Sequence, residues 1–302
     1  MDQDAVRAHL TGPVSSVKMP FNQDGSIDEE GLRNFIDRSI AGGSRSIILT
    51  AGDSHYYCLS DQEIARVTRI ACEHTAGRAM VVAADYNYST SRALEFAQYA
   101  CDVGADIYML LPPTWGGCTP EDLAAHYVSV AEVMPVVVVT AVFGQFSDSF
   151  ALETLRIMLG KSEGIMGIKD DRCEPFVHQM CLECHDRCAI FAGGSKRLHL
   201  SMMPFGCDGY MSNFVTLKPE LSTRYWKAVT AQDLATARKI IADYEAPLRQ
   251  YLMALPGGWN SGAHALLELY GVAKRWKRKP YTSLDDRAME EFAAFLKSKA
   301  LL

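Results

Sequence analysis

Eight short apolar segments, each followed by a stretch with helical periodicity, constrain the fold of this 302-residue chain more than any other feature. Strands that are apolar throughout are typical of parallel sheets with both faces covered. Eight such units in series predict an α/β protein, a (β/α)8 TIM barrel, and no glycine-rich dinucleotide turn follows the first segment to favour an open sheet. The predicted strands cover residues 14–19, 46–50, 80–84, 107–111, 136–140, 165–169, 189–192 and 209–212.

Capping signals and the end of the alternation define the domain organisation. Residues 60–63 read SDQE, which has the form of a capping box, and Thr119-Pro120 places proline at a first helical position. Beyond residue 225 the pattern is helical only. We therefore expect a barrel over residues 1–225 and a C-terminal helical extension over residues 226–302.

Composition excludes several classes of function. The longest apolar runs, such as residues 136–142, are too short to cross a bilayer, and the N-terminus lacks the order of a signal peptide. A net charge of -6 gives no general attraction for nucleic acid. Nine cysteines without an export signal are typical of reduced thiols. We expect a cytoplasmic protein that binds neither membranes nor nucleic acid.

A group of cysteines and histidines near residue 180 has two interpretations. One is a metal cluster. The other is an amphipathic helix, because Cys181, Cys184 and Cys188 follow the i, i+3, i+7 spacing of one apolar face. Helical spacing explains the pattern without a ligand, so we expect no metal site here. The whole group is Cys173, His178, Cys181, Cys184, His185 and Cys188.

Lys169 closes the predicted sixth strand, and active sites of such barrels lie at the carboxyl ends of the strands. An amine in apolar surroundings loses hydration, and its neutral form can attack a carbonyl to give a Schiff base. A lysine that leaves the strand for water, or meets Asp170, is the alternative. The position at the barrel mouth favours covalent chemistry.

Several short motifs, in this order and spacing, resemble the class I aldolases typified by dihydrodipicolinate synthase and N-acetylneuraminate lyase. The resemblance implies a Schiff-base lysine at Lys169, a 2-oxo acid such as pyruvate as the covalently bound partner, and a homo-oligomer, a tetramer or dimer. It implies no metal and no organic cofactor. The motifs are MPF at 19–21, DGSID at 24–28, LSDQE at 59–63, GIKD at 167–170, GCDGYMS at 206–212 and ALLELYG at 265–271.

The chain departs from this family where chemistry happens. The family's proton-relaying tyrosine on the fifth strand aligns with Thr140, a shorter and weaker acid. Asp53 stands in the loop that holds the oxo acid carboxylate in the family, where like charges repel. Gln145 aligns with the arginine that synthases use for a second carboxylate. Dihydrodipicolinate synthesis itself is therefore disfavoured.

These departures leave a lyase of aldolase or dehydratase type as the first hypothesis, with a small carbonyl compound as substrate. His55 is the substitute general acid or base, since imidazole titrates near neutrality. A barrel that has lost catalysis and acts as a binding or regulatory protein is one alternative; a metal-assisted lyase that uses Asp53, His55 and Asp85 is another. The predicted site has Lys169, Thr140 and His55 as catalytic residues, and Gly52, Asp53, Ser54, Trp115, Gln145, Gly194 and Ser195 as substrate-binding residues.

We predict that Asp53→Thr increases the trapping of pyruvate on Lys169 by borohydride. The change removes a repulsion that costs on the order of 4 kcal/mol at close range in a medium of dielectric constant near 20. Titration of both proteins with pyruvate, followed by mass spectrometry of the peptide that contains Lys169, measures the effect. Equal trapping, or tighter trapping by the wild type, would mean that Asp53 faces away from the carboxylate.

Overall fold

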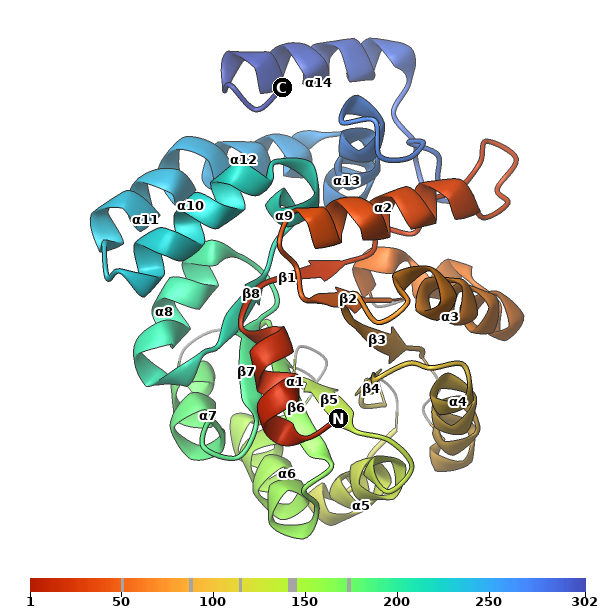
Figure 1. Ribbon diagram of the computed structural model, residues 1–302, viewed down its shortest axis with the longest axis vertical. Helices are drawn as coiled ribbons and strands as arrows, with labels where there is room; N and C mark the ends of the chain where they lie inside the picture. The colour runs from red at the N-terminus through yellow and green to blue at the C-terminus, as the bar shows by residue number, and fades with distance from the viewer. Residues whose placement is uncertain (50–51, 87–88, 114–115, 141–145, 173–174) are drawn as a thin grey trace.

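The fold prediction is confirmed in the computed structural model, in which the eight strands form one closed parallel barrel in chain order (Figure 1). The structure describes residues 1–49, 52–86, 89–113, 116–140, 146–172 and 175–302. The strands are β1 Gly12–Ser16, β2 Ser46–Ile48, β3 Met80–Ala84, β4 Ile107–Leu110, β5 Val136–Val139, β6 Ile165–Asp170, β7 Ala189–Ala192 and β8 Gly209–Met211.

Helices form the outer layer around this barrel. Helix α3 begins with the predicted capping box of Ser60 and Glu63. Helix α5 has proline at its start, as predicted, and also a capping box of Thr119 and Asp122 that was not predicted. The helices after successive strands are α2 Glu29–Ala41, α3 Asp61–Thr75, α4 Thr90–Asp102, α5 Pro120–Ala131, α6 Asp148–Lys161, α7 Phe176–Cys184 and α8 Lys196–Gly206, and β8 is followed by α9 Phe214–Leu217 and α10 Pro219–Thr230.

Side chains alternate between the barrel interior and the layer under the helices. Val137 and Val139 of β5 belong to the interior cluster, whereas Val136 and Val138 pack in the outer cluster. Because successive side chains of a strand point to opposite faces, the position of each residue at a strand end follows from this alternation.

A short N-terminal helix, α1 Gln3–Leu10, was not predicted. Its first turn is capped by Asp2, whose carboxylate accepts a hydrogen bond from the Ala5 amide at 2.8 Å. Val6 and Leu10 are fully buried in the interior cluster, and α1 crosses the end of the barrel opposite to the strand carboxyl ends (Figure 1). The helix therefore fills the amino end of the barrel.

The C-terminal helices lie together on one side of the barrel (Figure 1). They are α11 Leu234–Ile240, a π-helical segment Ile241–Glu245, α12 Ala246–Ala254, α13 Gly258–Leu269 and α14 Asp286–Ser298. Since α10 runs through residue 226, we propose the division between barrel and helical extension after Thr230. Within the described residues, no helix has the length and apolar character that a bilayer crossing requires.

We predict that Gly209→Ala destabilises the protein by about 3 kcal/mol or more. Gly209 pairs with Gly12 where β8 closes the barrel against β1, and a methyl group there would overlap the carbonyl oxygens of Leu10 and Gly12. Backbone oxygens cannot rotate away. Chemical denaturation measures the change in the free energy of unfolding.

Gly160→Ala is the matched control for this substitution. Gly160 lies in α6, and outside the neighbouring backbone of this helix no described atom lies within 4 Å of the position of its added methyl group. Alanine in a helix should leave stability unchanged or raise it by about 0.5–1 kcal/mol. Equal effects of the two substitutions would contradict the close approach at Gly209.

Candidate active site

Lys169 lies in the barrel mouth, as predicted, at the carboxyl end of β6. Its neighbour Ile168 packs in the outer cluster, so alternation directs the Lys169 side chain into the barrel. The side chain lines a hollow of about 400 Å³ whose walls include the apolar residues Met109, Val139 and Met211.

Asp171 is the partner of Lys169. The Lys169 ammonium donates a hydrogen bond to the Asp171 carboxylate, and both side chains line the hollow. Their side chains are 10% and 26% exposed, so the pair is largely sheltered from water. Asp171 was not among the residues predicted from the sequence, although its position two residues after Lys169 puts it on the same side of an extended chain.

Asp170 points the other way, into the layer under the helices. It is fully buried, and it accepts hydrogen bonds from the Thr140 hydroxyl and, at 3.0 Å, from the Arg172 amide. Burial raises the pKa of Asp170 to about 6, although both hydrogen bonds act in the opposite direction. Asp170 thus anchors the strand end and does not reach the hollow.

Thr140 was predicted to be a catalytic residue, and its position does not support that role. The strand partner of Lys169 is Val139, which lines the hollow, while the Thr140 hydroxyl donates to Asp170 on the outer side. A displacement of one residue along a strand exchanges its two faces. The fifth strand therefore presents a valine, without a titratable group, to the amine.

His55 does not line the hollow that contains Lys169. It occupies a left-handed backbone conformation between two short 3-10 turns, and its ring is buried. Lys277 Nζ lies 3.0 Å from His55 Nε2, the Tyr57 hydroxyl lies 3.2 Å from Nδ1, and the His264 ring centroid is 5.1 Å away. The turns carry His55 into a contact with the C-terminal segment, so the predicted role as acid or base for Lys169 is not supported.

The remaining residues of the predicted carboxylate loop have different positions. Gly52 lines the Lys169 hollow. The Ser54 hydroxyl is buried and donates to the Val17 carbonyl, so it does not offer its proton to a ligand. The side chain of Asp53, and the residues Trp115 and Gln145, lie outside the described part of the structure.

Metal ligation finds no support in the described residues. They contain no group of three histidine, cysteine or acidic side chains arranged to hold an ion. Asp85 accepts a hydrogen bond from the Tyr108 hydroxyl. Cys181 and Cys184 lie on the buried face of α7, as the helical interpretation predicts, and burial raises the pKa of each thiol to about 12.

The loop after β7 borders a second hollow of about 70 Å³ beside the first. Gly194 lines both hollows, and Ser195, which lines the second, caps α8 by accepting a hydrogen bond from the Leu198 amide at 3.1 Å. The prediction that these two residues border the site is consistent with their positions.

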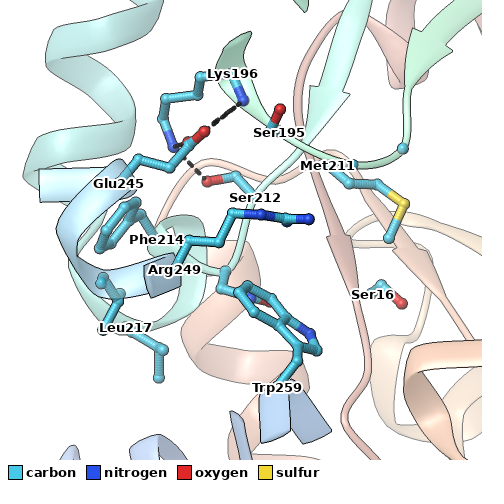
Figure 2. Close-up of a pocket in the computed structure, with 14 residues that line it drawn as sticks. Ser16, Ser195, Lys196, Met211, Ser212, Phe214, Leu217, Glu245, Arg249 and Trp259 are labelled. Carbon is cyan, nitrogen blue, oxygen red and sulfur yellow. Dashed lines mark hydrogen bonds and ion pairs between the residues drawn. The ribbon is translucent and has the colours of Figure 1, made fainter. Parts of the chain in front are cut away.

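Lys196 and Glu245 form a buried ion pair in the second hollow, with 3.1 Å between Nζ and the carboxylate (Figure 2). The ammonium also lies 4.6 Å from the ring centroid of Phe214. Burial lowers the pKa of Lys196 below its ordinary value, while the Glu245 charge opposes the shift. Glu245 also accepts from the Lys196 amide at 3.0 Å, so it caps α8 as well.

Two residues of the C-terminal helices complete the mouth. Arg249 of α12 and Trp259 of α13 line both hollows, and the Arg249 guanidinium lies 5.7 Å from the Trp259 ring centroid. Figure 2 shows Arg249 extending over Trp259 toward the side on which Ser16 and Met211 lie. Sequence reasoning missed both, because they lie far from Lys169 along the chain and carry no local motif.

Comparison with known proteins gives a consistent assignment. The sequence pattern of the dihydrodipicolinate synthetase family matches residues 9–299. The chain is similar to a 4-hydroxy-tetrahydrodipicolinate synthase of Bartonella bacilliformis, with 26% identity over 97% of this chain and 99% of the relative. It is also similar to a probable 5-dehydro-4-deoxyglucarate dehydratase of Streptomyces coelicolor, with 26% identity over 90% of this chain and 83% of the relative.

Solved structures share the fold. An N-acetylneuraminate lyase from Fusobacterium nucleatum superposes with a TM-score of 0.85 at 20% identity, over 96% of this chain and 99% of the other. A similarity at this identity supports the architecture, whereas the chemistry depends on the residues of the site.

We predict that Asp170 makes stability depend on pH. Its folded pKa of about 6 lies above the ordinary value of 3.8, so its contribution is full below about pH 4 and is lost as the pH rises through 6. Relative to Asp170→Asn, the wild type should lose up to about 3 kcal/mol of unfolding free energy between pH 4 and pH 7. Denaturation of both proteins across this range measures the difference, and a constant difference would contradict the raised pKa.

Proposed function

The chain belongs to the dihydrodipicolinate synthetase family, and from that premise we propose that Lys169 binds the substrate as a Schiff base. The protein is a lyase of this family, whose members act on carbon–carbon or carbon–oxygen bonds, and its substrate is a small 2-oxo acid or related carbonyl compound. The single observation that carries the proposal is an amine inside an apolar mouth, in contact with the carboxylate of Asp171.

The chemistry of Schiff-base formation matches these two groups. The ammonium of Lys169 gives a proton to Asp171, and the neutral amine adds to the carbonyl carbon. A carbon–nitrogen bond forms, and the carbonyl oxygen leaves as water with two protons that the amine has lost, one of them returned by Asp171. The resulting iminium keeps the positive charge beside the carboxylate.

The iminium then accepts electrons from the bond that breaks. In aldol cleavage this is a carbon–carbon bond; in dehydration a proton leaves first and a hydroxyl group follows. Val139 provides no proton carrier opposite the amine, so Asp171 is the acid–base group of the proposal. Dehydration and aldol cleavage each need one such base, so the proposed lyase could catalyse either reaction.

Assembly and location belong to the same proposal. A homo-oligomer, a tetramer or dimer, follows from the resemblance to the family. A cytoplasmic location agrees with the eight described cysteines, which are all free thiols. A barrel without catalysis is the second candidate, because Val139 stands where a proton carrier would be expected.

We predict that pyruvate and borohydride add mass to the peptide that contains Lys169, and that Lys169→Arg abolishes the adduct. Arginine keeps the charge beside Asp171 but is not deprotonated in proteins, so it cannot form the imine. Asp171→Asn should slow trapping by about 100-fold, because proton transfer loses its base. Asp186→Asn, at an exposed position, is the control and should trap at the wild-type rate.

Peptide mapping separates this outcome from its alternatives. An adduct that persists in Lys169→Arg and maps to Lys196, another buried amine near the mouth, would overturn the proposal that Lys169 forms the Schiff base. No adduct with any small oxo acid, together with no turnover, would favour the barrel without catalysis.

A further inference from the structure

We infer that the substrate carries a second anionic group, remote from its carbonyl, and that Arg249 binds it. This inference rests on the proposed Schiff base at Lys169 and names the substrate class of that site: a 2-oxo acid with a carboxylate at its far end. Arg249 is then a specificity-determining residue contributed by the C-terminal helices.

Arg249 lies where several hollows of the mouth adjoin one another. It lines the 400 Å³ hollow that contains Lys169, the 70 Å³ hollow that contains Lys196, and an outer groove of about 740 Å³. It therefore lies where the Lys169 hollow opens outward. A ligand that is bound covalently at Lys169 and extends toward the opening would present its far end to Arg249.

The guanidinium of Arg249 carries a positive charge that no described carboxylate lining these hollows is left to neutralise. The carboxylates that line these hollows are already paired: Asp171 with Lys169, and Glu245 with Lys196. In the part of the chain that the structure describes, Arg249 has no ion-pair partner, and its recorded contact is the Trp259 ring. A guanidinium that stacks on an aromatic face keeps its edge N–H groups available for the bidentate binding of a carboxylate.

The backbone that carries Arg249 is held in place relative to the barrel. Glu245 lies one helical turn before it, at the junction between the π-helical segment and α12. Glu245 binds both the amide and the ammonium of Lys196, so the start of α12 is fixed to the start of α8. The position of Arg249 is thereby set relative to the barrel, as a specificity contact requires.

The size of the cavity limits the substrate. A hollow of 400 Å³ lies in the range of small-molecule sites. It suits a linear acid of about five or six carbons with its carbonyl at Lys169 and its second carboxylate at the opening. The Ser54 hydroxyl donates to Val17. Among the described residues that line this hollow, the cations are Lys169, which is paired with Asp171, and Arg249.

Borohydride trapping of two six-carbon acids tests the inference. 2-Oxoadipate and 2-oxohexanoate share the reactive end and differ by the terminal carboxylate. The wild type should trap 2-oxoadipate at a half-saturating concentration about tenfold or more below that of 2-oxohexanoate, because the charged pair forms only with the diacid. Arg249→Met should bring the two concentrations to within about twofold of each other.

Arg197→Met is the matched control, since Arg197 lines the outer groove but neither inner hollow. It should keep the wild-type preference for the diacid. Equal trapping of both acids by the wild type, or a preference that survives in Arg249→Met, would overturn the inference and leave the Schiff base intact.

Glutarate, which has no carbonyl, separates the two proposals. If no oxo acid is trapped at Lys169, the Schiff-base proposal fails. Thermal stabilisation by glutarate in the wild type, lost in Arg249→Met and kept in Arg197→Met, would then still support the anion site. An absence of stabilisation in the wild type would overturn the anion site as well.

Discussion

The alternation of side chains along β6, fixed by the register of a closed barrel, is the constraint on which the site depends. Lys169 pairs with Val139 on one side and with Phe191 on the other. This register sends the amine into the barrel and Asp170 into the layer under the helices. The closed barrel leaves no edge strand along which β6 could slip, so the amine and its neighbour cannot exchange places.

A buried ammonium group also shapes the structure around the mouth. Taking an ammonium out of water is costly unless a carboxylate or an aromatic face replaces its hydration. Lys196 has both, in Glu245 and Phe214. Because Glu245 belongs to the C-terminal helices and Lys196 to the barrel, one buried pair also connects the two parts of the chain. The groups that replace the hydration of one amine thus hold the C-terminal helices against the barrel beside the cavity.

How much could be predicted from the sequence depends on the range of the interactions. The strands and Lys169 were predictable, because apolar runs and the end of a strand are local features. Thr140 was aligned with the family's tyrosine, but Val139 holds the inward position. Strand positions read from sequence are uncertain by one residue, and a shift of one residue exchanges the two faces. His55 itself has a left-handed backbone conformation, and Arg249 reaches the mouth through the packing of distant helices. Neither feature leaves a periodic signal in the sequence.

Helix α1 limits the route by which substrate and product enter and leave the barrel. Val6 and Leu10 are packed into the amino end of the barrel and close it. The candidate site therefore opens to solvent through the carboxyl end. A substrate that is cleaved or dehydrated there releases water and product through the same opening by which it entered. Under the proposed Schiff base at Lys169, the fragment that is not attached to the lysine leaves through this opening before the attached fragment, which imposes an order on product release.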